Sequence, residues 1–123
     1  MRFHTRLLAA FTLVAALAAV ATVPAAAEPG AQAAKSCGIG NGRGYGTSYV
    51  TSLSVTGTSC KNGKKVVKAF HACRPGKKGK CDHAVLGYSC TEKRYNQLST
   101  TYDSKVTCKK GSRRVKHTYT QLT

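Results

Sequence analysis

The sequence predicts an α+β domain in which one helix packs on a small antiparallel sheet, in the order β-α-β-β-β, stapled by three disulfides. One segment repeats its apolar residues at helical spacing, and four others alternate polar and apolar residues as half-buried strands do. In addition, six cysteines follow an N-terminal segment that has the features of a secretory signal. Small exported domains commonly pair their cysteines, so disulfides are expected here.

Residues 1–27 have the three parts of a signal peptide. A start with two arginines precedes a charge-free apolar run from Leu7 to about Val23, and an A-x-A type site ends at Ala27. We predict cleavage after Ala27, with Ala34 as the alternative position. A membrane anchor is the competing interpretation, because the apolar run approaches the ~20 residues that span a bilayer. Cleavage would give a secreted, extracellular protein with no transmembrane span.

The charge of the chain is strongly positive. It has 20 lysine and arginine residues against 4 aspartate and glutamate residues, a formal net charge of +16. Cleavage after Ala27 removes two arginines and no acidic residue, which lowers this charge by two to +14. Self-repulsion then destabilises the compact state, and the apolar supply is small, since Phe70 is the only phenylalanine left. Crosslinks worth roughly 2–4 kcal/mol each offset both disadvantages.

A flexible arm rich in Ala, Pro and Gly is predicted at residues 28–48, ahead of a disulfide-stapled domain at residues 49–123. Glycine occupies every second position of residues 38–46. A nucleotide-binding glycine loop requires a strand before it and a helix after it, and here a linker precedes the glycines. We therefore interpret the segment as an arm pinned at Cys37.

A strand is predicted at residues 47–56, because apolar residues alternate there with Thr and Ser. A helix follows at about residues 60–72, with Thr58 or Ser59 as its N-cap. The dipeptide Asn62-Gly63 is also a strong hairpin signal, but its flanks do not alternate cleanly. The apolar face of the helix consists of Cys60, Gly63, Val66, Val67, Phe70 and Cys73.

A basic turn at residues 74–80 ends the helix, and three strands follow it. The second strand is predicted at about residues 84–94. A polar connection at residues 95–102 leads to the third strand, and a turn at residues 110–112 leads to the fourth. The inward positions are Leu86, Tyr88 and Cys90 on the second strand, Val106 and Cys108 on the third, and Val115, His117 and Tyr119 on the fourth.

All six cysteines are predicted to form disulfides. Packing of the helix on the sheet favours crosslinks from the helix to the strands, although six cysteines allow fifteen pairings. A local bridge between Cys73 and Cys81 is the alternative. In the favoured arrangement, Cys60 and Cys73 pair with Cys90 and Cys108, which leaves Cys37 and Cys81 as the third pair.

Several short runs form a set across residues 47–123. They are Thr58-Ser59-Cys60, Val66-Val67 with Phe70, Cys73-Arg74, Gly87-Tyr88-Ser89-Cys90, Val106-Thr107-Cys108, Lys110-Gly111 and Tyr119-Thr120-Gln121. With the cysteine spacing and the alanine-rich signal, this set resembles small secreted cysteine-rich proteins of actinobacterial type. The resemblance implies a helix rather than a hairpin at Asn62-Gly63. The group has no established activity, so it implies no functional residue.

No motif predicts an enzyme, and we expect no catalytic residue, no cofactor and no metal. A small basic ribonuclease would use two histidines and a lysine. However, His71, His83 and His117 fall on a helix, a loop and a strand, and nothing in their spacing brings them together. The acidic residues are too few and scattered for a glycosidase pair. A metal site would lack a C-x-x-C pair and compete with disulfides for its candidate ligands Cys73, Cys81, His83 and Cys90.

The basic surface is therefore the main functional candidate. A charge above the ~2–8 that serves solubility favours contact with a polyanion, although simple solvation of the surface is the alternative. One contiguous face would support a binding site, and an even spread would support solvation. The three basic clusters are the helix stripe Lys61, Lys64, Lys65 and Lys68, the turn Arg74, Lys77, Lys78 and Lys80, and the last hairpin with Lys109, Lys110, Arg113 and Arg114.

We predict a monomeric, non-enzymatic binding domain that contacts an anionic surface or polymer. Its partner would be a wall polymer, an acidic lipid, a nucleic acid or an acidic protein. A secreted inhibitor of a hydrolase, which presents residues 74–80 as a rigid loop, is one alternative. An antimicrobial protein is another, and a small basic ribonuclease ranks below both. The salt dependence of binding distinguishes a polyanion-binding domain from a hydrolase inhibitor, because contacts to phosphates weaken steeply as the salt concentration increases.

Overall fold

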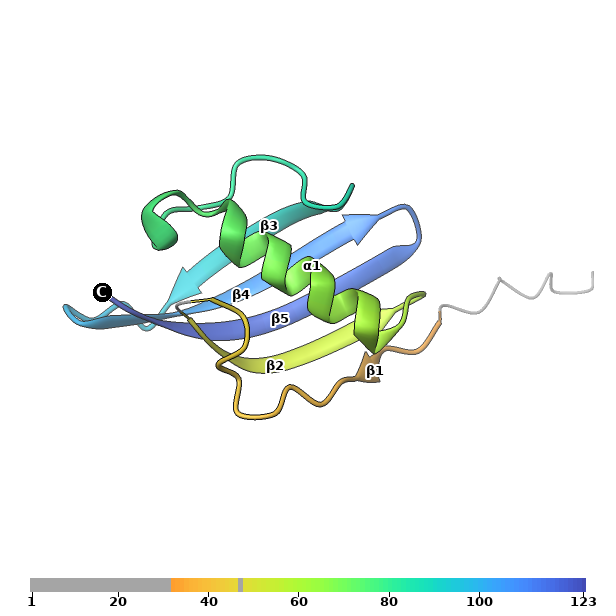
Figure 1. Ribbon diagram of the computed structural model, residues 1–123, viewed down its shortest axis with the longest axis horizontal. Coiled ribbons are helices and arrows are strands. Elements are labelled where there is room, and N and C mark those ends of the chain that lie inside the picture. Colours follow the sequence, from red (N-terminus) through yellow and green to blue (C-terminus); the bar gives the residue numbers. More distant parts are fainter. Residues whose placement is uncertain (1–31, 47) are drawn as a thin grey trace, which may run out of the picture. The chain divides into compact units, whose positions relative to one another are not determined.

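The structure, a computed structural model, describes residues 32–46 and 48–123. The predicted signal peptide and the first residues of the predicted arm lie outside these ranges. The helix α1 (Cys60–Cys73) covers one face of a five-stranded antiparallel sheet (Figure 1). The predicted α+β fold is thereby confirmed. Among the described residues, no helix is long and apolar enough to cross a membrane.

The sheet has the strand order β1-β2-β5-β4-β3, and every neighbouring pair is antiparallel. Strands β2 to β5 correspond to the four predicted strands. Strand β1 was not predicted, because two residues are too few to leave an alternating pattern. The strands are β1 (Lys35–Ser36), β2 (Tyr49–Thr56), β3 (Ser89–Tyr95), β4 (Thr101–Lys110) and β5 (Arg113–Leu122), and a short 3-10 turn, η1 (Pro75–Lys77), follows the helix.

The second predicted strand is shorter than its sequence pattern indicates. Leu86 and Gly87 have positive φ angles of 51° and 77°. They form a two-residue turn, across which the backbone groups of Val85 and Tyr88 bond to each other. This turn leaves Leu86 55% exposed, so the prediction that it faces inward is wrong, whereas Tyr88 is buried. The regular strand therefore begins only at Ser89.

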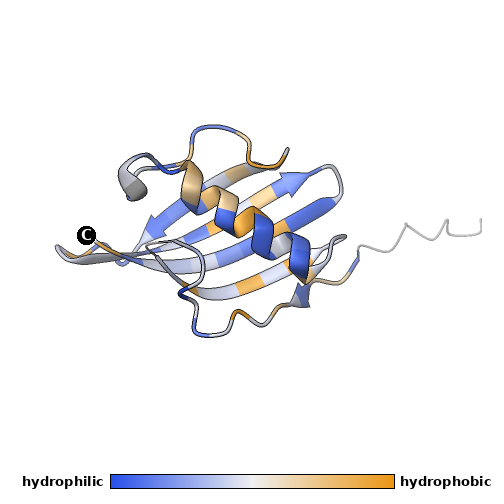
Figure 2. Ribbon diagram, in the orientation of Figure 1, coloured by the Kyte–Doolittle hydropathy of each residue, from blue (hydrophilic) through white to orange (hydrophobic). Residues whose placement is uncertain are grey.

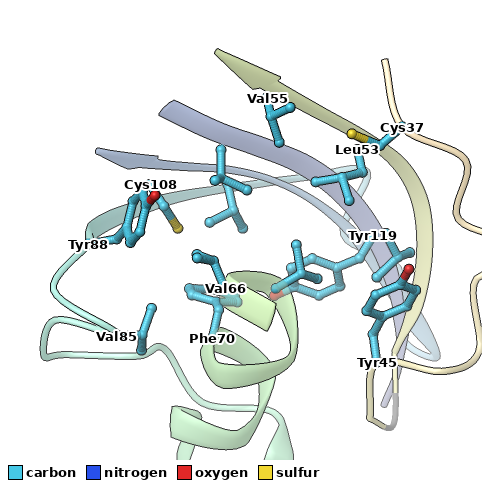
Figure 3. Close-up of a cluster of buried hydrophobic side chains, with 14 of the residues drawn as sticks. Cys37, Tyr45, Leu53, Val55, Val66, Phe70, Val85, Tyr88, Cys108 and Tyr119 are labelled. Carbon is cyan, nitrogen blue, oxygen red and sulfur yellow. The ribbon is translucent and has the colours of Figure 1, made fainter. Parts of the chain in front are cut away.

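The helix begins where its cap was predicted. The Ser59 hydroxyl accepts a hydrogen bond of 3.2 Å from the backbone N–H of Asn62. Asn62 and Gly63 lie inside the helix, so the hairpin alternative is wrong. Figure 3 shows Val66 and Phe70 pointing from the helix into the buried cluster. Burial of this apolar face against the sheet, rather than helix propensity, stabilises α1.

The glycine-rich segment packs on the domain. Cys37 and Tyr45 belong to the buried cluster (Figure 3). The backbone N–H of Val50 donates a hydrogen bond of 3.0 Å to the carbonyl of Gly42. A Cβ at Gly42 would collide with the carbonyl of Val50, so glycine lets the loop run this close to β2. This part of residues 28–48, which was predicted as a flexible arm pinned at Cys37, therefore packs against the domain beyond that cysteine as well.

The three disulfides pair Cys37 with Cys60, Cys73 with Cys81, and Cys90 with Cys108. The favoured helix-to-sheet pairing is therefore wrong, and the local alternative is confirmed. The ends of α1 are joined to adjoining loops, where the paired Cα atoms lie 5.6 Å and 5.3 Å apart. The two strand cysteines are register partners on β3 and β4, which places them next to each other.

Candidate functional site

The helix stripe lies on the outer side of α1. Val66, Val67 and Phe70 face the sheet, so the opposite side of the helix meets solvent. Figure 2 shows hydrophilic stretches of the helix ribbon between its hydrophobic ones. This cluster is separated from the far face of the sheet by the thickness of the domain. Its exposed members are Lys61, Lys65 and Lys68, and Lys64 is half-buried.

The predicted hairpin cluster is divided between the two faces of the sheet. Lys109 and Arg114 are register partners on β4 and β5, and both are exposed on the face that α1 does not cover. Lys110 lies on the other face, where its ammonium donates a hydrogen bond of 3.3 Å to the carbonyl of Leu86. Since side chains alternate between faces along a strand, sequence neighbours such as these do not form one patch.

Arg74 of the turn cluster lies in the interior. It is only 3% exposed. Its guanidinium donates to the carbonyl of Gly79 at 2.9 Å and to the hydroxyls of Ser48 at 3.0 Å and Tyr102 at 2.6 Å. Contrary to the prediction, Arg74 does not belong to the basic surface, and these acceptors satisfy the hydrogen-bonding needs of its buried guanidinium. The turn presents Lys78 and Lys80 to solvent.

The face of the sheet that α1 does not cover, which we call the open face, carries five cations on three strands. Along these strands, buried residues such as Val106 and Val115, which face α1, alternate with lysines and hydroxyl side chains that face away from it. Three of these lysines are absent from the predicted clusters, which were sought among sequence neighbours. The period-two alternation was the signal that could have found them. The cations are Lys93 on β3, Lys105 and Lys109 on β4, and Arg114 and Lys116 on β5.

Four of these cations face each other in direct pairs. Lys93 is the register partner of Lys105, and Lys109 is the register partner of Arg114. Like charges directly opposite each other destabilise a sheet. Asp103 shares this face, but its carboxylate already accepts hydrogen bonds from a neighbouring hydroxyl and a neighbouring amide. The open face therefore concentrates positive charge at a cost in stability.

Hydroxyl groups fill the positions between these cations. A register shift between Val50 and Ser52 places an extra residue in β2. Such a bulge re-aims side chains, and Thr51 and Ser52 both lie with their hydroxyl oxygens 2.6 Å from that of Thr118. Beside the bulge lies a hollow of about 240 Å³, lined by Ser52, Ser54, Lys105, Lys116, His117 and Thr118.

Two histidines meet between α1 and the sheet. The ring centroids of His71 and His117 lie 5.3 Å apart, although their sequence spacing gave no reason for this. Burial and then the charge of Arg74 lower the pKa of His71 to about 4. Burial, His71 and Arg74 lower the pKa of His117 to about 3. The rings are therefore neutral near pH 7 and enclosed by core side chains, unlike the solvent-facing acid and base of a ribonuclease.

Glu92 lies on the face of the sheet that α1 covers, which we call the covered face, and one of its carboxylate oxygens accepts hydrogen bonds from three donors. Its Oε1 accepts hydrogen bonds from Arg94 at 2.8 Å and from the hydroxyls of Ser104 and Tyr119 at 2.7 Å each. Burial opposes ionisation of Glu92, but these hydrogen bonds outweigh burial and hold its pKa below its usual value. The acidic group is thus committed to a fixed internal network.

Cys73, Cys81 and His83 come close enough together to resemble a metal site, since their ligand atoms lie within 4.8 Å of one another. However, Cys73 and Cys81 form a disulfide. The thiolate is the form of cysteine that binds metals, so the bridge occupies both sulfurs. His83 bonds to the exposed carboxylate of Asp82 at 2.9 Å. In the oxidised protein, this group therefore does not offer a set of ligands.

Similarity to known proteins assigns no function to this site. No protein-family model, curated protein or solved structure matches the chain. The resemblance to small secreted cysteine-rich proteins therefore stays a prediction. The open face is the candidate site because it combines charge, hydrogen-bond donors and a hollow on one surface.

Proposed function

We propose that the protein is a secreted, non-enzymatic binding domain that holds an anionic polymer on the open face. The observation that carries this proposal is the pairing of Lys93 with Lys105 and of Lys109 with Arg114 across neighbouring strands. Charge that serves solubility alone has no need of such pairs, which repel each other. A bound polyanion would remove this repulsion and release the counterions of both partners.

The sheet also supports such contact better than the helix stripe does. Neighbouring strands lie about 4.8 Å apart, so the backbone fixes the spacing of the open-face cations. Ser and Thr hydroxyls lie between these cations and can donate hydrogen bonds to an anion. Because lysine predominates, contact is by point charge rather than bidentate recognition. Binding is therefore expected to depend strongly on salt and weakly on the sequence of the polymer.

Two matched triple variants test the proposal. The first, Lys93→Gln with Lys105→Gln and Lys116→Gln, removes three charges from the open face. The second, Lys61→Gln with Lys65→Gln and Lys68→Gln, removes three from the helix stripe. We expect the open-face triple to lower the affinity for polyphosphate by more than about tenfold at low salt, and the salt slope by about 2. Equal losses in both triples would reduce the effect to net charge, and no loss in the open-face triple would contradict the proposal.

A second candidate function is inhibition of a hydrolase by the turn at residues 74–80. The Cys73–Cys81 disulfide closes this turn, and the guanidinium groups of Arg74 and Arg94 both donate to the carbonyl of Gly79. A loop held in this way loses little entropy on binding. Salt distinguishes the two functions, because a packed inhibitor interface keeps its affinity where a polyanion complex dissociates.

A further inference from the structure

We infer that the hollow beside the β2 bulge is a subsite for one tetrahedral oxyanion, namely a phosphate or sulfate ester group of the bound polymer. The inference rests on the proposed function and adds the chemical class of the ligand and the place where it is recognised. Three features of the hollow support it: two lysines in its lining, the hydroxyl residues beside them and the bulge next to it.

The two lysines come from adjacent strands. Lys105 is the register partner of Thr118, which lies two residues beyond Lys116 on β5. The two lysines are thus diagonal neighbours, whose backbones are separated by about 7–8 Å. Side chains of this length can converge on a group bound between them, and both line the hollow. Lysine is a common point-charge ligand of phosphate.

The hydroxyl groups provide a donor that their own hydrogen bonds do not use. Thr51, Thr118 and Ser52 form a chain in which Thr118 contacts both of the others at 2.6 Å. Each hydroxyl has one proton and two lone pairs. Two contacts within the chain use two protons, so one hydroxyl keeps a proton for another acceptor, and two of the three hydroxyls, those of Ser52 and Thr118, belong to residues that line the hollow. Ser54 adds a further hydroxyl to the wall of the hollow.

The bulge gathers hydroxyl groups on the β2 side of the hollow. It places Thr51 and Ser52, which are consecutive in sequence, against the same residue of β5. Ser52 and Ser54 therefore line the hollow from β2, Lys105 lines it from β4, and Lys116 and Thr118 line it from β5. A tetrahedral oxyanion presents oxygen atoms in several directions and can meet these donors together. A planar carboxylate presents two oxygens in one plane and meets fewer of them.

A charge-neutral variant separates this subsite from general attraction. Ser52→Ala with Ser54→Ala and Thr118→Val removes the hydroxyls of the hollow and keeps every cation. The matched control removes three other open-face hydroxyls, by Thr56→Val, Thr91→Val and Thr107→Val. The probes are polyphosphate, dextran sulfate and polyglutamate of similar charge. We expect the hollow variant to bind the first two about tenfold more weakly and polyglutamate as the wild type does. The control should bind all three polymers like the wild type.

A titration of the wild type with inorganic phosphate gives a second readout that needs no variant. The backbone amide resonances of Ser52, Lys105 and Thr118 should shift saturably, ahead of those on the helix stripe. If the hollow variant binds all polymers like the wild type, or loses polyglutamate equally, the subsite is wrong while the proposed function stands. If the wild type binds no polymer, the proposed function fails. Saturable shifts would then still support the subsite, and uniform or absent shifts would overturn it.

Discussion

The covered and open faces of the sheet are built by the same strands and differ in how they treat polar groups. On the covered face, Arg74 and the Oε1 atom of Glu92 take part in a buried hydrogen-bond network with neighbouring hydroxyls and Arg94. On the open face, hydroxyls and cations meet solvent, and Lys93 repels Lys105. The covered face therefore stabilises the fold, and the repulsion between cations on the open face offsets part of that stability.

The disulfides lie on the covered side of the sheet and not on the open face. Two of them anchor the ends of α1, and the third joins Cys90 to Cys108, which is buried on the covered face. Each bridge is worth roughly 2–4 kcal/mol. Crosslinks thus reinforce the side of the sheet that already holds the core, and substitutions on the open face leave them untouched.

The largest expected effect is a loss of stability in acid, because the histidines buried between α1 and the sheet take up protons only when the chain unfolds. The pKa values of His71 and His117 fall from 6.5 to about 4 and about 3 on folding. Between pH 6.5 and these lowered values, the unfolded chain binds more protons than the folded chain does. The two histidines therefore cost no stability above pH 6.5, and the free energy of unfolding falls as the pH decreases below it. We expect a loss of several kcal/mol in urea unfolding between about pH 7 and about pH 4. Glu92 adds to this loss only below its usual pKa of 4.5.

The variant His117→Phe tests the cause of this acid sensitivity. The phenylalanine ring can occupy the aromatic cluster around Phe70 but cannot take up a proton. The pH dependence of its unfolding free energy should be flatter than that of the wild type. An unchanged dependence would show that other groups cause the loss.

The next largest effect is expected for Arg74→Ala, which breaks the covered-face network. The substitution leaves the buried acceptors on Ser48, Tyr102 and Gly79 without this donor. Loss of a buried network of this kind should lower the free energy of unfolding by about 3 kcal/mol. The control Lys78→Ala, on the exposed side of the same turn, should change it by less than about 0.5 kcal/mol. A similar small change in both variants would contradict the interior role of Arg74.

A smaller effect is expected for Gly63→Ala, which fills the contact between α1 and the covered face. The added Cβ would lie 2.5 Å from Cγ1 of Val55. Overpacking of this kind costs about 1–3 kcal/mol, of which the better helix propensity of alanine returns about 1 kcal/mol. Urea unfolding should therefore show a net loss of up to about 2 kcal/mol. Gly38→Ala, where a Cβ meets open space, is the control that should show none.

The smallest effect, and the one of opposite sign, is expected for Lys93→Gln on the open face. Removal of its repulsion with Lys105 should raise the free energy of unfolding by about 0.2–0.5 kcal/mol at low salt and weaken polymer binding. The gain should shrink as salt screens the pair. Lys80→Gln, which removes a charge from an exposed loop, should give no gain. A loss of stability in Lys93→Gln would contradict the repulsion between the two lysines.

Most of the fold could be predicted from periodicity, because burial of one face imposes a pattern on each element. The helix starts at Cys60 as predicted and ends one residue beyond the expected position, at Cys73. The turn at Leu86 was missed, since leucine is an unusual residue for a positive φ angle. The disulfide pairing was missed because it depends on the paths of the loops, which follow no period.

The candidate site was harder to predict than the fold. Lys93, Lys105 and Lys116 become neighbours only through strand register, which no single segment reveals. The hollow depends on a bulge in β2 that interrupts the register without a glycine or proline to mark it. Arg74 has the sequence context of a surface residue, but in the fold carbonyl and hydroxyl groups and the Tyr119 ring surround its guanidinium.

The opposed cations on β3, β4 and β5 make the heat resistance of this domain a property of its ionic surroundings. Their charges are close together, so the repulsion is screened only by small ions at high concentration or by a polymer bound across the strands. Added salt should therefore raise the melting temperature of the unbound protein while it displaces the polymer. The polymer in turn stabilises whatever fraction it occupies, by mass action. The folded state is thus least secure in dilute, ion-poor water.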